Sequence, residues 1–425
     1  MVPDLAVFSY KARIVDALLA EKLSYAGAVV IRGPKWCGKT ETALQHACSA
    51  VMMQDPDTRK NNLLLAETKP SLLLRGNKPR LIDEWQEAPQ LWDAVRFAVD
   101  RERVSGGYIL TGSATPQKKP QHSGTGRFSF LDMLPMTLFE SGDSTNEVSI
   151  ADLFDGGEVD GFASTDVEVI AYLVCRGGWP VAALYQSGSL ALEMAYDYVS
   201  AIAEEDISRA DGVARNAQYA RVIMAEYARC TAMQTTQTTI RKDLKARGTE
   251  LSKDTVDSYI ATLRRLFVIQ DLSAWAPSLH SKSRITKSPT RHFADPSIAA
   301  AALRANPSSL LQDMSTLGLL FESLCVRDLR GYGQALKGEV LHYHDGSGLE
   351  ADAVLSLRDG RYALFETKMS ARLIDEGAAN LLAIAKKIDT SVMGSPSFCA
   401  VLTPGGYAYQ RKDGVYVIPV TCLRP

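Results

Sequence analysis

Short apolar runs separated by polar loops and helix-like stretches mark the first part of the chain. Ala28–Ile31, Leu81–Ile82 and Tyr108–Leu110 are such runs, and each is followed by polar or glycine residues. The stretch Glu41–Ala47 after the first run has the spacing of a helix. Alternation of short buried strands with helices is typical of a domain built on a parallel sheet. We therefore predict a parallel α/β domain at the start of the chain.

The next part of the chain is mostly helical. Residues 167–209 have helix-like spacing, interrupted at Gly177–Pro180 by two glycines, a tryptophan and a proline. Because such a cluster breaks a helix, we expect helices on either side of it. The preceding residues 145–165 are acidic and contain glycine, and we predict that they form a linker.

A further helical group follows and ends in two strand-like runs. The predicted elements are helices at Tyr219–Thr231 and Thr238–Ala246, a helix capped by Ser252, and strands at Val268–Trp275 and Arg291–Ala294. Short helices, a turn, a longer helix and a hairpin are the ingredients of a winged helix. A winged helix can contact DNA or can serve packing within the chain, and its shape alone favours neither.

Alternating apolar and polar positions return near the end of the chain. Leu349–Leu355 alternates like a strand, Arg358–Gly360 forms a turn, and Tyr362–Glu366 returns as the partner. This pattern predicts an antiparallel hairpin. An apolar helix is predicted before it, over Leu317–Leu329.

Composition limits what these parts can be. The chain has 425 residues, 46% hydrophobic and 23% charged, which is ordinary globular composition and too long for one domain. No apolar run approaches the roughly 20 residues of a membrane span, and no secretory signal is visible. Seven cysteines without paired metal spacing are expected to be free thiols. We therefore expect a cytoplasmic protein without a membrane partner.

The segment after the first apolar run carries a specific motif. Residues 33–40 fit the pattern G-x-x-x-x-G-K-[ST] of a phosphate-binding loop. In such a loop backbone N–H groups surround the phosphates, the lysine reaches the β- and γ-phosphates, and the hydroxyl ligates Mg²⁺. We therefore predict ATP and Mg²⁺ as ligands. The predicted nucleotide-binding residues are Gly33, Pro34, Lys35, Trp36, Cys37, Gly38, Lys39, Thr40 and Glu41.

Two acids, Asp83 and Glu84, end the second apolar run. We expect Asp83 to hold the Mg²⁺ that Thr40 also ligates, and Glu84 to polarise the water that attacks the γ-phosphate. In ATPases with a catalytic glutamate, a strand between the two motif strands ends in a polar sensor, and Thr111 or Ser113 fits that role. The predicted catalytic residues are Lys39, Glu84, Ser113 and Arg127.

Arg127 is a candidate arginine finger, the side chain that stabilises charge on the transferred phosphoryl group. It follows the polar, glycine-containing loop 117–125. A surface arginine fits the sequence equally well. In a ring of copies, Arg127 would be supplied in trans.

The net charge of −2 gives no overall basic surface for nucleic acid. Residues 236–295 nevertheless hold eleven Lys and Arg against six Asp and Glu, an excess of five positive charges. Lys253, Arg264 and Arg265 are expected to lie off the apolar face of their helix. DNA is therefore a candidate partner. The basic residues are Arg241, Lys242, Lys245, Arg247, Lys253, Arg264, Arg265, Lys282, Arg284, Lys287 and Arg291.

The predicted hairpin near the end of the chain carries a second constellation. Asp352 lies on its first strand, and Glu366 and Lys368 end its second in a Glu-x-Lys pattern. This is the pattern of a PD-(D/E)xK nuclease site, where two carboxylates hold Mg²⁺ and the lysine positions water. Glu322 on the preceding helix would add a carboxylate to this second metal site. A surface hairpin whose charges pair with one another fits equally well, because the motif is short.

Together these motifs resemble a widespread prokaryotic family of AAA+-like ATPases with a C-terminal domain of unknown function that has a restriction-endonuclease-like fold. The resemblance implies ATP binding and hydrolysis, with a winged helix before the C-terminal domain. Ala353 departs from it, since a bulkier apolar residue is expected after the acid. The segments that carry the resemblance are 33–40, 82–86, 111–113, 126–127, 134–136, 177–180, 292–296, 318–322, 350–352 and 366–368.

The expected fold is therefore α/β: a P-loop AAA+-type parallel-sheet domain, a helical lid, a winged helix and a PD-(D/E)xK nuclease-like α/β domain. The expected bounds are 1–145 for the ATPase domain, 166–215 for the lid, 216–295 for the winged-helix-like module and 296–425 for the restriction-endonuclease-like domain. The expected function is an ATPase that acts on DNA, alone or as a homo-oligomeric ring. The alternative is a nucleotide-controlled switch or scaffold whose nuclease-like domain is catalytically silent.

Overall fold

A computed structural model describes residues 10–114, 123–186, 188–276, 288–388 and 393–425. The chain divides into two compact units, Met1–Met133 and Leu134–Pro425, which we call unit 1 and unit 2. Unit 1 ends before residue 145, where the sequence placed the first boundary. Of the helices described, none combines the length and the apolar character that crossing a membrane requires.

Unit 1 is built on a five-stranded sheet in the order β2-β3-β4-β1-β5, and all neighbouring strands are parallel. Its strands are β1 (Ala28–Arg32), β2 (Ser49–Met52), β3 (Arg80–Asp83), β4 (Tyr108–Gly112) and β5 (Phe128–Asp132). Its helices are α1 (Ile14–Tyr25), α2 (Lys39–His46), α3 (Arg59–Thr68) and α4 (Gln90–Glu102).

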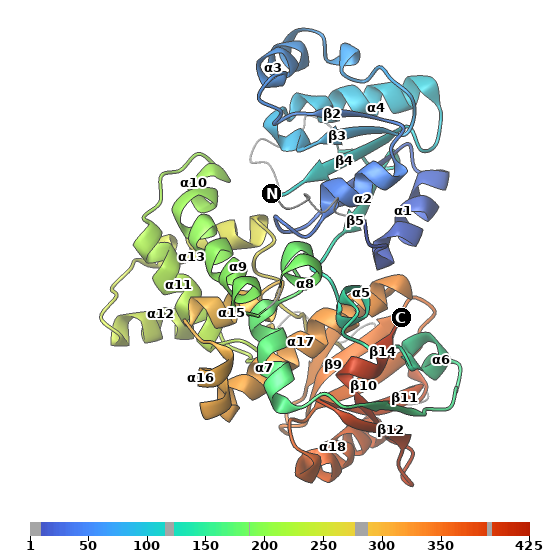
Figure 1. The fold of residues 1–425 in the computed structure, drawn as a ribbon, viewed down its shortest axis with the longest axis vertical. Helices are drawn as coiled ribbons and strands as arrows, with labels where there is room; N and C mark the ends of the chain where they lie inside the picture. Colours follow the sequence, from blue (N-terminus) through green and yellow to red (C-terminus); the bar gives the residue numbers. More distant parts are fainter. Residues whose placement is uncertain (1–9, 115–122, 187, 277–287, 389–392) are drawn as a thin grey trace, which may run out of the picture. The chain divides into compact units, whose positions relative to one another are not determined.

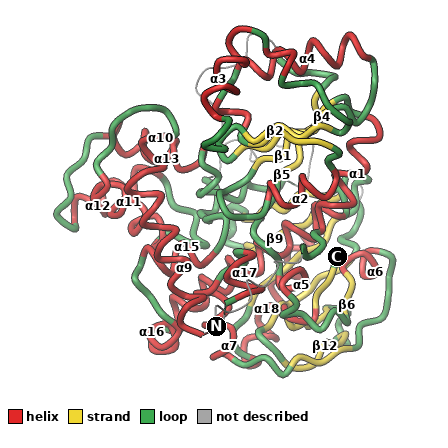
Figure 2. Tube along the Cα trace, turned by 45° about the horizontal axis from the view of Figure 1, so that its top comes forward, coloured by secondary structure: helices red, strands yellow, loops and turns green. Residues whose placement is uncertain are grey.

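Helices cover both faces of this sheet (Figures 1 and 2), with α3 and α4 on one face and α1 and α2 on the other. Along β1, Ala28 and Val30 belong to the core beneath α3 and α4, whereas Val29 and Ile31 belong to the core beneath α1 and α2. Because both faces are buried, the strands are continuous apolar runs rather than alternating ones. The predicted parallel α/β domain is confirmed.

The strand order brings three motif-bearing strands together. β4 pairs with β1 on one side and with β3 on the other, so that Thr111 lies beside Ile31, and Leu110 beside Ile82. The strand that leads into Thr111 and Ser113 was predicted to lie between the other two motif strands, and β4 has that place. Since parallel strands end at one edge of the sheet, the residues after β1, β3 and β4 meet there.

Unit 2 begins with short elements and a helical group. The helices before and within this group are α5 (Leu138–Ser141), α6 (Ile150–Phe154), α7 (Val167–Arg176), α8 (Pro180–Tyr185), α9 (Gly188–Ala201), a π-helical turn (Ile202–Asp206) and α10 (Ile207–Arg209). The break predicted at Gly177–Pro180 is present, because α7 ends at Arg176 and α8 starts at Pro180. A lid over the nucleotide remains a prediction for these helices.

The predicted second helical group is also present. It comprises α11 (Ala217–Arg229), α12 (Gln237–Ala246) and α13 (Lys253–Arg265). The Ser252 side chain accepts a hydrogen bond from Thr255 N at 3.1 Å, as its predicted capping role requires. In place of long strands, the structure has single antiparallel bridges that join Ile269 to Phe293 and Leu272 to Thr290. Lys282, Arg284 and Lys287 lie outside the described residues.

The remainder of unit 2 is a seven-stranded mixed sheet in the order β7-β12-β13-β11-β10-β9-β8. The predicted hairpin is confirmed, since β9 and β10 pair antiparallel with Val354 opposite Leu364. The strands are β7 (Gly161–Ala163), β8 (Gly338–His344), β9 (Glu350–Leu357), β10 (Tyr362–Thr367), β11 (Phe398–Thr403), β12 (Gly406–Gln410) and β13 (Tyr416–Pro419). Helices α17 (Met314–Ala335) and α18 (Ile374–Lys387) pack against this sheet, whereas α15 (Pro296–Ala302) and α16 (Pro307–Gln312) pack against the preceding helical group.

The segment 145–165 does not form the linker that its composition predicted. It contributes β6 (Val148–Ser149), which pairs with β14 (Leu423–Arg424), and it contributes β7 at the edge of the large sheet. Its apolar residues Ile150 and Leu153 are buried. Burial of these side chains against unit 2 outweighs the flexibility that acids and glycine suggested.

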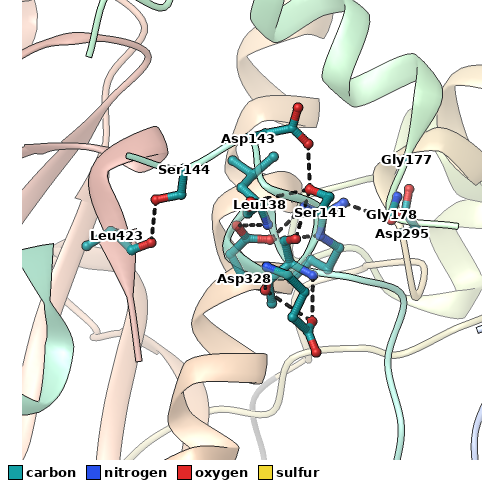
Figure 3. A network of polar contacts seen from close by, with 12 residues as sticks. Leu138, Ser141, Asp143, Ser144, Gly177, Gly178, Asp295, Asp328 and Leu423 are labelled. Carbon is teal, nitrogen blue, oxygen red and sulfur yellow. Dashed lines mark hydrogen bonds and ion pairs between the residues drawn. The ribbon is translucent and has the colours of Figure 1, made fainter. Parts of the chain in front are cut away.

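A buried polar network joins distant segments of unit 2 (Figure 3). Asp328 accepts a hydrogen bond from Leu138 N at 3.0 Å, and Asp295 accepts one from Gly178 N at 2.9 Å. Arg327 lies between the two acids, with its guanidinium 3.0 Å from Asp295 and 2.7 Å from Asp328. The network holds the start of α5 and the turn after α7 against the start of α15 and the middle of α17.

Candidate functional site

The phosphate-binding loop connects β1 to α2 at the carboxyl edge of the unit 1 sheet. Gly38 has a φ of 99°, a backbone conformation that other residues rarely adopt. At Gly33 a side chain would place its Cβ 2.1 Å from the Met133 carbonyl oxygen, so only glycine fits. These two glycines therefore allow the tight path that a phosphate-binding loop needs.

Lys39 is the buried cation of this loop. Its Nζ donates to the carbonyl oxygens of Gly33 at 3.1 Å and Pro34 at 2.7 Å. The ammonium group thus lies within the curve of the loop, where the motif requires a positive charge for phosphate oxygens. Of the other loop residues, Trp36 is exposed and has a φ of 65°.

Asp83 and Thr40 are in direct contact. Asp83 Oδ1 accepts hydrogen bonds from Thr40 Oγ1 and from Thr111 Oγ1, both at 2.7 Å. A carboxylate beside the hydroxyl of a phosphate-binding loop is the donor set that Mg²⁺ with bound phosphates prefers. The residues present therefore fit a Mg²⁺–nucleotide complex.

Glu84 lies next to this pair in a strained conformation. Its φ of 54° is unusual for a residue with a side chain, and such strain is typical of functional sites. Its Oε2 accepts hydrogen bonds from Ser113 Oγ at 2.9 Å and from Gln86 Nε2. Thr111 Oγ1 accepts a hydrogen bond from Glu84 N at 3.0 Å. The side chains of Ser113 and Gln86 therefore fix the orientation of the Glu84 carboxylate.

Two residues of this site were not singled out from the sequence. Gln86 also donates to Ser113 Oγ at 3.3 Å, and its place two residues after Glu84 was the available signal. Arg13 is buried and donates from Nη1 to the Cys37 carbonyl oxygen at 2.7 Å, so it supports the phosphate-binding loop from the position directly before α1. No motif in the sequence pointed to Arg13.

Arg127 does not join the other predicted catalytic residues within unit 1. It directly precedes β5, and its carbonyl oxygen accepts from Ala28 N at the amino end of β1. The phosphate-binding loop follows the other end of β1, about 16 Å away at the usual rise per residue. Arg127 instead pairs with Asp100 at 2.7 Å on the surface. It therefore has no access to the phosphate-binding loop of its own unit.

The second predicted site has three of its charged residues, Asp352, Glu366 and Lys368, on or directly after the β9–β10 hairpin, whereas Glu322 lies on α17. Glu366 is buried, with its carboxylate 3.0 Å from Lys368 Nζ and 3.1 Å from Asn380 Nδ2. Asp352 Oδ2 accepts hydrogen bonds from the backbone and the hydroxyl of Thr367, both at 2.7 Å. These contacts occupy much of the hydrogen-bonding capacity of both carboxylates.

Burial and mutual repulsion both disfavour the charged forms of these carboxylates. Burial raises the pKa of Glu322, and the nearby charges of Asp352 and Glu366 raise it further. Burial, and then the charge of Asp352, raise the pKa of Glu366 as well. Within the described ranges, no group of three or more His, Cys, Asp or Glu could hold a metal ion. Glu322, Asp352 and Glu366 therefore do not form the three-carboxylate metal site that the sequence predicted.

Most described basic residues of 236–295 already form ion pairs. Arg264 lies 2.7 Å from Asp271, and Arg265 lies 3.5 Å from Asp211. The others in ion pairs are Arg241 with Asp257, Lys245 with Glu250, Arg247 with Glu226 and Arg291 with Asp271. The exposed cations Lys242 and Lys253 have no ion pair with the residues that the structure describes. The free positive charge of this surface is therefore smaller than the sequence indicated.

Three family models match successive parts of the chain. Residues 26–141 match a family described as an AAA domain. Residues 167–309 and 317–423 match two families described as domains of unknown function, DUF8612 and DUF4143. The chain thus contains an AAA-type, ATPase-like domain followed by two regions whose families carry no assigned function.

Relatives along the whole chain are distant. Uncharacterized proteins of Mycobacterium tuberculosis (Rv2008c) and Mycobacterium bovis (Mb2031c) are each 22% identical over 414 residues, 96% of this chain and 83% of the relative. The Walker-type ATPase paby2304 of Pyrococcus abyssi is 14% identical with a TM-score of 0.41, over 68% of this chain and 94% of its own. The ORC2 protein of Aeropyrum pernix is 14% identical with a TM-score of 0.32, over 73% and 97%. Neither structural likeness is close enough to bear on the fold.

Proposed function

We propose that unit 1 binds ATP with Mg²⁺ at the phosphate-binding loop and hydrolyses it. The observation that carries this proposal is the meeting of three strand ends at one edge of the sheet. There Asp83 accepts from both Thr40 and Thr111 at 2.7 Å, and Ser113 donates to Glu84 at 2.9 Å. The AAA-domain match over residues 26–141 supports the same activity.

Each residue has a distinct role in this proposal. Lys39 neutralises charge on the β- and γ-phosphates, and Thr40 and Asp83 hold Mg²⁺. The bound Mg²⁺ neutralises charge on the phosphate oxygens. Glu84 orients and polarises the attacking water, while Ser113 and Gln86 keep its carboxylate in place. Phosphoryl transfer needs this positioning and charge neutralisation more than covalent chemistry.

The test is ATP binding and hydrolysis by the native chain and by Lys39→Ala. We expect the variant to lose both, because Lys39 supplies the buried ammonium group inside the curve of the loop. Lys60→Ala is the matched control, since Lys60 is an exposed lysine on α3 of the same unit. Native hydrolysis by Lys39→Ala would contradict the proposal, as would absence of binding by the native chain.

The finer proposal is that ATP turnover serves an action on DNA through the α11–α13 group and the C-terminal sheet. The exposed Lys242 and Lys253 support a DNA contact, although most neighbouring cations are paired. The alternative is a nucleotide-controlled switch or scaffold with a silent nuclease-like domain. Stimulation of ATP hydrolysis by DNA favours the first, and an unchanged rate favours the second.

An arginine-finger role for Arg127 requires a second copy of the chain. Within unit 1, Arg127 lies at the opposite edge of the sheet from the phosphate-binding loop. A ring in which each copy completes its neighbour's site would satisfy this requirement. It would give a rate of hydrolysis per copy that falls on dilution, and a rate independent of concentration would exclude it.

A further inference from the structure

Unit 1 has a groove at the edge of its sheet that lies away from the phosphate-binding loop. The groove has a volume of about 760 Å³ and is lined by the second half of α4, the turn after α3 and the loop before β3. β3 starts at Arg80, and α4 runs back from the carboxyl edge to end at Glu102. The groove therefore lies at the amino edge, and a nucleotide at the other edge would not occupy it.

The lining of this groove is strongly basic. It contains Lys69, Arg75, Lys78 and Arg101, against one acid, Glu102. Glu102 lies 3.7 Å from Arg101 and 3.9 Å from Lys78, so its single charge is shared between them. Lys69 and Arg75 are exposed, and neither has an ion pair with any residue that the structure describes. The groove thus keeps an excess of three positive charges in a chain of net charge −2.

An aromatic side chain lies among these cations. Phe97 lines the groove and is 62% exposed, although phenylalanine is normally buried. Arg101 follows it by one helical turn on α4, so both side chains lie on the same face of the helix. Lys78 Nζ lies 3.3 Å from the centre of the Tyr108 ring, which fixes this cation at the groove wall. Exposed aromatic surface between cations can stack on a flat base.

We propose that this groove binds single-stranded nucleic acid. Lys69, Arg75 and Arg101 would contact phosphates, and the Phe97 ring would stack on one unpaired base. A positively charged groove with an exposed aromatic platform is the usual means of holding a single strand without reading its sequence. Paired bases in a duplex offer no free face to Phe97, and an acidic peptide offers charge without a flat ring. The inference rests on the proposed action on nucleic acid for its ligand class, but it does not require ATP hydrolysis.

The test uses the full chain without ATP and a fluorescent oligothymidylate, with binding followed by anisotropy at pH 7. Burial lowers the pKa of Lys78 to about 8. This pKa is still above 7, so most Lys78 side chains keep their charge at that pH. We expect Phe97→Ala to weaken binding roughly tenfold, the usual effect of removing one base stack. Tyr25→Ala is the matched control, because Tyr25 on α1 is 60% exposed and lies outside the groove.

Charge reversal tests the phosphate contacts separately. Arg75→Glu should weaken binding and make its salt dependence less steep, by roughly 0.7 in the log–log slope for each phosphate that is no longer neutralised. Lys60→Glu makes the same charge change on α3 outside the groove and should have no effect. Phe97 and Arg75 are both exposed, so unfolding midpoints equal to the native value are expected and exclude misfolding as the cause.

Several outcomes would overturn the inference. They are equal affinity for a duplex of the same length, equal affinity for polyglutamate, or native affinity of both Phe97→Ala and Arg75→Glu. Lys39→Ala should bind the oligonucleotide like the native chain. Loss of ATP hydrolysis in that variant with intact oligonucleotide binding therefore separates this inference from the proposed function.

Discussion

At the scale of single residues, the roles of the two acids in the nucleotide site follow from the hydroxyl groups that donate hydrogen bonds to each carboxylate. The Asp83 carboxylate accepts hydrogen bonds from Thr40 and Thr111, whereas the Glu84 carboxylate accepts them from Ser113 and Gln86. The two adjacent acids thus have separate sets of partners. This separation leads us to assign Asp83 to Mg²⁺ and Glu84 to water.

Glu84→Gln tests that separation. We expect the variant to bind ATP as the native chain does, because Lys39, Thr40 and Asp83 are unchanged. Its turnover should fall about 100-fold or more, since an amide does not accept the proton of the attacking water. The measurements are ATP affinity by titration and the steady-state rate of phosphate release.

Glu87→Gln is the control for this change. Glu87 lies one turn away, and its carboxylate pairs with Arg59 at 2.9 Å rather than with the site. Its turnover should equal that of the native chain. Native turnover by Glu84→Gln would move the role of base to another residue and remove our assignment.

The residues in the phosphate-binding motif were predictable because the motif fixes their positions along the chain. Gln86 and Arg13 were not, because each reaches the site through a contact that spacing does not encode. For Arg127 the sequence predicted a role in the site, and the fold places the residue away from it. Its sequence position after a glycine loop suggested a finger, but only the pairing of β5 with β1 shows which edge of the sheet it occupies.

At the scale of elements, periodicity predicted the helices and the hairpin closely. It failed for residues 145–165, where short apolar stretches pair with β12 and β14 from the far end of the chain. Two- and three-residue strands leave no periodic signal, and their partners lie more than two hundred residues away in sequence. Acids and glycine then dominate the local pattern and suggest a linker.

The network around Arg327 explains why the turn after α7 and the start of α5 lie against α15 and α17 in unit 2. Asp295→Ala would leave the buried Arg327 with Asp328 as its remaining acid and would remove the acceptor of Gly178 N. We expect a loss of about 3–5 kcal/mol in the free energy of unfolding, because one partner of a buried ion pair is removed. Chemical denaturation of the native chain and the variant measures this difference.

A surface ion pair provides the comparison for this experiment. Asp359 pairs with Arg361 at 2.8 Å in the exposed turn of the β9–β10 hairpin. Asp359→Ala should leave the free energy of unfolding unchanged within error, because water screens such a pair. Equal stability of Asp295→Ala and Asp359→Ala would show that the buried network does not hold these segments together.

At the scale of the whole molecule, charge counted along the sequence overstated the basic surface of the α11–α13 group. Arg265 and Arg247 pair with Asp211 and Glu226, acids that lie before residue 236 and were outside that count. Conversely, the basic groove of unit 1 draws its cations from separate segments, so no local excess appeared in the sequence. Surface charge depends on what folding brings together.

The last prediction concerns Asp352 and Glu366. Their state decides whether the C-terminal sheet could cleave DNA or could only bind a partner. In the structure Glu366 is paired with Lys368, and Asp352 is held by Thr367. These contacts occupy carboxylate oxygens that a metal ion would otherwise need. We therefore expect no cleavage of linear, supercoiled, branched or single-stranded DNA incubated with the chain and Mn²⁺.

The variants Asp352→Ala and Lys368→Ala should then match the native chain in that panel and should keep its ATP hydrolysis. Asp359→Ala, in the turn of the same hairpin, controls for any change of charge near the sheet. Binding of Mn²⁺ can be followed directly by calorimetry, and we expect no heat change in the native chain that Asp352→Ala abolishes. Nicking that requires Mn²⁺ and disappears in both Asp352→Ala and Lys368→Ala, but persists in Asp359→Ala, would overturn the silent assignment. It would establish instead that unit 2 cleaves phosphodiester bonds through Asp352 and Lys368.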